Sequence, residues 1–157
     1  MEKKEFTLTL ALVDALPVLF FGGAAAMLGV KLQSALFIVG AALCLLAGAG
    51  KVAWKVLLAL KGKDVAILGA QLRYVMPVGF LLMMLGGFFA EGETLRALLH
   101  AAVRLPSAAF FTLTIVGLIA MVVCARKFDR FDVRANWIEQ GINAAAQACA
   151  MIGVLLL

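Results

Sequence analysis

Long apolar runs without charge dominate this chain and restrict it to folds that place helices in lipid. The clearest run, residues 107–125, carries no charged side chain. A bilayer core about 30 Å thick takes about 20 helical residues, and runs of this length exceed what a soluble core helix needs. Charged residues make up only 15% of the chain, against about 25% in a soluble domain. We therefore expect an all-α integral membrane protein.

Five segments of this kind follow one another along the chain. We predict membrane-spanning helices over residues 7–30, 34–58, 65–90, 107–125 and 135–157. The stretch 93–105 differs, because polar residues recur on one helical face and leucines on the other, which is typical of a helix in the membrane interface. The predicted fold is a single membrane domain over residues 1–157: a bundle of five transmembrane helices plus one short amphipathic interfacial helix.

The last predicted span carries one polar stripe on an otherwise apolar or small-residue helix. Glu139, Asn143 and Gln147 recur every four residues and so lie on one helical face. Such a face presents amide and carboxyl groups to neighbouring helices, and the surrounding alanines allow close packing. We expect this helix near the centre of the bundle. Asn136, three residues before Glu139, resembles the cap residue of a capping box.

Basic residues near the span ends predict the orientation, because cytoplasmic loops carry an excess of Lys and Arg. Eight basic residues fall on the side of the N-terminus and three on the other side. The eight are Lys3, Lys4, Lys61, Lys63, Arg126, Lys127, Arg130 and Arg134, and the three are Lys31, Arg96 and Arg104. We therefore expect the N-terminus in the cytoplasm, and the C-terminus and the interfacial helix outside.

Polar residues inside the predicted spans gather at one depth. At about 1.5 Å per helical residue, all of them fall in the cytoplasmic half of the bilayer. The cluster comprises Asp14, Lys51, Lys55, Gln71, Arg73, Glu139, Asn143 and Gln147. A charge at the bilayer centre costs about 2.5–3.5 kcal/mol, so such residues pair or face a wet cavity. Two carboxylates against three cations leave one spare positive charge, and we expect Asp14 and Arg73 to pair directly or through water.

The same residues also have a purely structural explanation. Lys51 and Lys55 can extend to the headgroups, and Glu139 can act only as a capping residue. Asn143 and Gln147 can hydrogen-bond between helices. Under the functional explanation, the cluster lines a cavity that opens to the cytoplasm and binds an anionic or zwitterionic ligand.

Motifs that carry catalysis or bind metals are missing from the sequence. Cys44, Cys124 and Cys149 lie far apart inside predicted spans, where they are typical of small packing residues rather than of a disulfide or a metal site. The sequence has no catalytic triad pattern, no paired aspartates and no glycine-rich phosphate loop. We expect no cofactor and no metal, and we lean against an enzyme.

Three functions remain open on these observations. The first is a transporter or channel for a small anionic or zwitterionic solute, with hinges at Pro17 and Pro77, where the missing backbone N–H weakens the helix. The second is a non-catalytic accessory subunit that recruits a protein partner through residues 126–134. The third is a lipid-binding subunit that uses the cationic inner end. The expected partners are the bilayer and a second copy of the chain, and we expect no nucleic acid.

Overall fold

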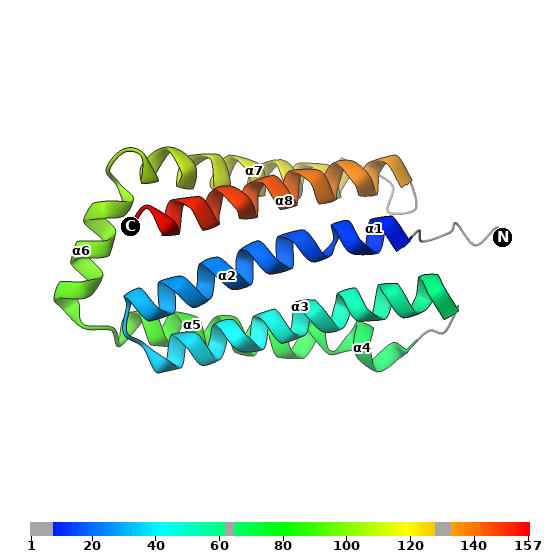
Figure 1. The fold of residues 1–157 in the computed structure, drawn as a ribbon, viewed down its shortest axis with the longest axis horizontal. Coiled ribbons are helices and arrows are strands. Elements are labelled where there is room, and N and C mark those ends of the chain that lie inside the picture. The colour runs from blue at the N-terminus through cyan, green and yellow to red at the C-terminus, as the bar shows by residue number, and fades with distance from the viewer. Residues whose placement is uncertain (1–7, 62–64, 128–132) are drawn as a thin grey trace.

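The computed structural model describes residues 8–61, 65–127 and 133–157, and every element in them is a helix. The helices are α1 (Leu8–Val13), α2 (Ala15–Lys31), α3 (Ala35–Lys61), α4 (Ala66–Ala70), α5 (Leu72–Phe88), α6 (Gly92–Ala102), α7 (Ser107–Lys127) and α8 (Val133–Leu155). Figure 1 shows the long helices side by side, with α6 standing across one end of the bundle. The predicted all-helical bundle is confirmed.

Four helical stretches are long and apolar enough to cross a membrane: Ala11–Lys31, Ala35–Lys61, Ala66–Phe88 and Ser107–Cys124. They correspond to the first four predicted spans and support an integral membrane protein. The fifth predicted span coincides with α8, which is of similar length but more polar than these four. The basic segment 126–134, predicted to recruit a partner, lies partly outside the described residues.

The central helix is α2, and not the last helix as the polar stripe suggested. It packs against α3 on one side and against α8 on the other, while α5 packs on α3 and α7 packs on α8 (Figure 1). Small residues explain this position, because they let neighbouring helices approach closely. A side chain at Gly22 or Gly29 would meet α3, and one at Gly23 would meet Met151 of α8.

The first span is broken where its proline predicts a kink. α1 ends at Val13 and α2 begins at Ala15. Pro17 has no N–H to donate to the carbonyl of Val13, so the regular hydrogen-bond ladder stops there. The break leaves Asp14 at the junction, with its side chain buried. In the third span, by contrast, Pro77 lies inside α5, and the interruption falls earlier, between α4 and α5.

Glycine and serine bring α3 and α5 into close contact. Gly86 lies directly against the backbone of Phe37, so that a Cβ at Gly86 would overlap the Phe37 amide nitrogen. Ser34, just before α3, accepts a hydrogen bond from the Phe37 N–H at 3.3 Å and donates one to the Gly86 carbonyl at 3.0 Å. Ser34 therefore caps α3 and joins it to the far end of α5.

The amphipathic helix α6 packs part of its apolar face against the bundle. Its Leu95 and Leu98 pack against a buried cluster formed by Ala25, Leu32, Phe37 and Ala41, near the turn between α2 and α3. Leu99 remains exposed, as do Val103 and Leu105 in the connection to α7. The leucines were all expected to face lipid. Two of them instead close this end of the bundle, because α6 crosses from α5 to α7 over the ends of α2 and α3.

Candidate functional site

A groove between α5 and α7 is the main concave feature of the bundle. α5 and α7 do not pack along each other's length among the described residues, since each packs on its own partner, α3 or α8. The space left between them is a cavity of about 710 Å³, and α2, α3 and α8 supply the rest of its wall. This volume lies in the range of about 300–1,000 Å³ that is usual for small-molecule sites.

The groove is polar at one end and apolar at the other. Five residues of the predicted cluster line it together: Asp14, Lys51, Glu139, Asn143 and Gln147. They come from the α1–α2 junction, the second half of α3 and the first two-thirds of α8, toward the end of the bundle where α1 begins (Figure 1). Toward α6 the wall becomes apolar, with Leu28, Phe37, Met83 and Val154.

Asp14 forms a buried ion pair with Lys55. The Lys55 ammonium contacts the Asp14 carboxylate, and the two side chains are only 10% and 4% exposed. Breaking such a pair leaves an uncompensated buried charge, so each group holds the other in place. The prediction that Asp14 pairs with Arg73 is therefore wrong. Nor does Lys55 extend freely to the headgroups, because α3 turns it inward against the α1–α2 junction.

Lys51 and Glu139 line the same groove without such compensation. Both side chains are half-buried, Lys51 on α3 and Glu139 on α8. No hydrogen bond or ion pair engages either side chain within the part of the chain that the structure describes. A half-buried charge without a partner is costly unless a ligand or water meets it. The groove thus presents one cation and one anion that are available to an occupant.

Gln71 and Arg73, the other two members of the predicted cluster, lie outside the groove. Gln71 donates a hydrogen bond from its side-chain amide to the carbonyl of Ala47, at 3.0 Å, which ties the α4–α5 junction to α3. Arg73 is exposed on α5. The charged groove residues are then Asp14, which Lys55 neutralises from behind the wall, and Lys51 and Glu139, so the spare positive charge expected from the sequence is not there.

The stripe of α8 faces the groove and does not cap the helix. α8 begins at Val133, so Asn136 lies inside the helix and does not occupy the cap position that was predicted for it. Glu139, Asn143 and Gln147 all contribute to the groove wall. Their common face, read from the four-residue spacing, is therefore the face that points into the cavity.

Several groove residues were not anticipated from the sequence. Gln140 of α8 and Thr114 of α7 also line the wall. The Thr114 hydroxyl hydrogen-bonds to the carbonyls of Phe110, at 2.9 Å, and Ala146, at 3.3 Å, so its own polarity is already satisfied. Phe21 of α2 and Phe80 of α5 bring their rings to 5.7 Å within the groove. The sequence could not identify these residues, because it does not reveal how each helix is rotated about its own axis.

The described residues contain no cluster of His, Cys, Asp and Glu side chains able to hold a metal ion. The three cysteines are free thiols, and Cys44 is buried in the contact between α3 and α5. No family model matches the chain, and neither a curated protein nor a solved structure is significantly similar to it. The groove is therefore the feature of the molecule that points to a function.

Proposed function

We propose that this protein is a membrane transporter for a small zwitterionic molecule that also carries an apolar group, and that the molecule binds in the groove between α5 and α7. The observation that carries the proposal is the pair of uncompensated opposite charges, Lys51 and Glu139, in one groove wall. A ligand with both an anionic and a cationic group satisfies both. A purely anionic or cationic ligand leaves one charge unmet.

The charge balance favours a zwitterion over the anion that the sequence also allowed. Asp14 and Lys55 neutralise each other, and Arg73 lies on an exposed part of α5. Lys51 and Glu139 then bring no net charge to the groove. Asn143 and Gln147 add hydrogen-bonding amides along the same α8 face, and these can fix the orientation of a polar headgroup.

The apolar half of the groove favours a ligand with an apolar group. Beyond the ring pair of Phe21 and Phe80, the wall consists mostly of Phe, Leu, Met and Val side chains. Burying apolar surface there contributes about 25 cal/mol per Å². We infer that the ring pair separates the polar end of the groove from its apolar end. Passage of a ligand along the groove then requires these two rings to move apart.

We place the bundle in the bilayer with α8 as a fifth crossing and with α6 in the interface. α8 has 23 residues and is thus about 35 Å long, and its polar stripe is turned into the groove instead of into lipid. The exposed Leu99, Val103 and Leu105 beside α6 suit an apolar boundary. The excess of basic residues at the α1 end favours that end as cytoplasmic, so the polar end of the groove faces the cytoplasm.

A lipid-binding role is the second candidate. The groove opens along the side of the bundle between α5 and α7, so a lipid could enter it sideways from the membrane. This alternative uses the same headgroup end and the same apolar wall, but it predicts binding without net movement across the bilayer.

The first experiment compares three single-chain amphiphiles that share one tail. Their heads are zwitterionic phosphocholine, a neutral sugar and an anionic sulfate, and retention by the purified full chain is measured by native mass spectrometry. We expect the zwitterion to be retained best. Lys51→Gln and Glu139→Gln should each weaken its retention about tenfold, the factor that corresponds to one charge-assisted hydrogen bond.

Arg73→Gln is the matched control, because it removes a cation from a similar level of the bundle but outside the groove. Equal retention of all three heads, or an equal effect of Arg73→Gln and Lys51→Gln, would overturn the zwitterion site. Flux of the phosphocholine probe into proteoliposomes then separates the two candidates. Transport predicts flux that Lys51→Gln abolishes, whereas the lipid-binding role predicts retention without flux.

A further inference from the structure

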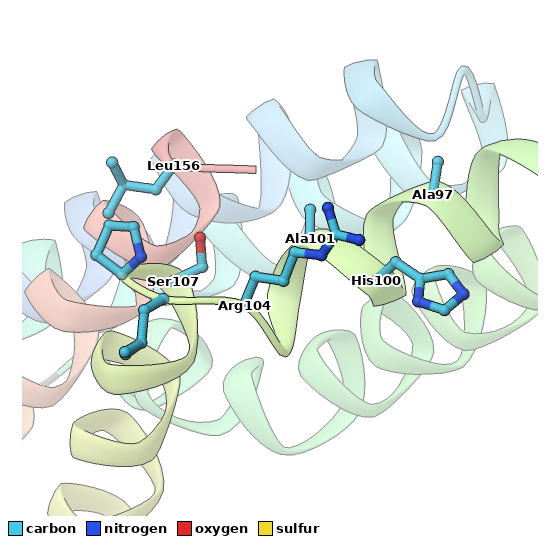
Figure 2. A pocket seen from close by; sticks show the side chains of 8 residues that line it. Ala97, His100, Ala101, Arg104, Ser107 and Leu156 are labelled. Carbon is cyan, nitrogen blue, oxygen red and sulfur yellow. The ribbon is translucent and has the colours of Figure 1, made fainter.

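A second pocket lies at the opposite end of the bundle, in the elbow where α6 meets α7. Its volume is about 520 Å³, and it is lined by residues of α6, of the connection, of the start of α7 and of the end of α8. The polar side chains in it are His100, Arg104 and Ser107 (Figure 2). It shares no residue with the groove between α5 and α7.

Ser107 is the unusual residue of this pocket. Only 2% of its surface is exposed, yet its hydroxyl has no hydrogen-bond partner among the described residues. The hydroxyl oxygen itself is not fully enclosed, because the side chain lines the pocket, so it can donate a hydrogen bond to an occupant there. Figure 2 shows the Ser107 hydroxyl near Leu156, whereas the Arg104 side chain extends along α6 with its guanidinium next to Ala101.

The charges around Ser107 favour an anion. Ser107 is the first residue of α7, a helix of 21 residues, and the N-terminal end of a helix carries a partial positive charge. The Arg104 guanidinium is exposed and has no ion-pair partner in residues 8–61, 65–127 or 133–157. His100 lines the edge of the same pocket. A fork of N–H donors and a hydroxyl donor that line one pocket suit the several oxygens of a phosphate group.

The side chains around Arg104 suit a position at a membrane surface. Val103 and Leu105 on either side of Arg104 are exposed, and so is Leu99 on the preceding turn. A cation set among exposed apolar side chains is typical of the boundary between headgroups and acyl chains.

We propose that the α6–α7 elbow is a binding site for a phosphate group, held by Arg104 and the Ser107 hydroxyl, with the N-terminal end of α7 contributing a partial positive charge. The phosphate of a membrane lipid and free inorganic phosphate share this chemistry. The proposal does not depend on the function of the groove, because the elbow pocket shares no lining residue with it and lies far from its polar end.

The test uses the full chain after removal of bound lipid, with native mass spectrometry as the readout. Phosphatidylglycerol is compared with a diacylglycerol that has the same acyl chains and no phosphate. We expect selective retention of phosphatidylglycerol, weakened about tenfold by Arg104→Gln and by Ser107→Ala. Arg96→Gln is the matched control, since Arg96 is an exposed arginine of α6, eight residues before Arg104, and does not line the pocket.

Competition with inorganic phosphate distinguishes the two sources. Displacement of the lipid by inorganic phosphate would support a general phosphate site, and lack of displacement would support a site for the lipid headgroup. Equal retention of diacylglycerol, or equal weakening by Arg96→Gln and Arg104→Gln, would overturn the proposal. Arg104→Lys keeps the charge but lacks the planar guanidinium fork. We expect this variant to elute as a folded protein in size-exclusion chromatography, which excludes a folding artefact. Its retention of phosphatidylglycerol should be intermediate.

Discussion

The ammonium of Lys55 on α3 meets the carboxylate of Asp14 at the break between α1 and α2, and both side chains are almost wholly buried. This contact joins the first two spans at the level where the polar end of the groove begins. Lys51 lies one turn before Lys55 on α3 and lines the groove itself. Lys55 therefore stabilises the fold, whereas Lys51 is available to a ligand.

The ion pair predicts strongly non-additive effects on stability. Asp14→Asn or Lys55→Met alone should lower the free energy of unfolding by about 3 kcal/mol, because each leaves a buried charge without its partner. The double variant should lose much less than the sum of the two. Reversible unfolding in mixed micelles measures all three. Arg73→Gln should change stability by less than about 0.5 kcal/mol, and additive losses for the pair would contradict direct contact.

Two adjacent glycines of α5 should respond very differently to alanine. A Cβ at Gly86 would overlap the backbone of Phe37, whereas a Cβ at Gly87 meets nothing within 4 Å. Because backbone cannot move aside as a side chain can, Gly86→Ala should separate α3 from α5 and cost about 2 kcal/mol. Gly87→Ala should be close to neutral. Thermal unfolding in detergent compares them, and similar midpoints would contradict the described contact.

The hydrogen bond from Gln71 to Ala47 depends on a glycine one turn along α3. A Cβ at Gly50 would occupy the position of the Gln71 side-chain amide. Gly50→Ala should therefore displace this amide and cost about 1 kcal/mol, the order of an interhelical hydrogen bond in a membrane. In a Gln71→Ala background, the same change should cost almost nothing. An equal cost in both backgrounds would show that Gly50 matters for another reason.

Single cysteines can test the orientation of the bundle. Lys61 at the end of α3 and His100 on α6 lie at opposite ends and are both exposed (Figure 1). In a variant without the three native cysteines, Lys61→Cys should react with an impermeant maleimide only after the cells are opened. His100→Cys should react in intact cells. The reverse pattern would invert the predicted topology, and labelling of both in intact cells would contradict a membrane-spanning bundle.

Properties that run along a helix axis could be read from the sequence. Predicted boundaries of the spans agree closely with the helices, because long apolar runs, a serine cap at Ser34 and the break set by Pro17 are local features. The depth of each polar residue also follows from its count along the helix. The groove end accordingly collects Asp14, Lys51, Glu139, Asn143 and Gln147.

Properties that depend on how each helix is rotated about its axis could not be read from the sequence. Arg73 and Lys55 lie at similar levels along the bundle axis, but only Lys55 faces Asp14, because α3 packs directly on the first span and α5 packs on the far side of α3. The central position of α2 and the burial of Leu95 and Leu98 were missed for the same reason. Hydropathy and spacing determined which segments are helices and at which level of the bundle each charge lies. Close packing of small residues between distant segments decided which charges meet and which remain free.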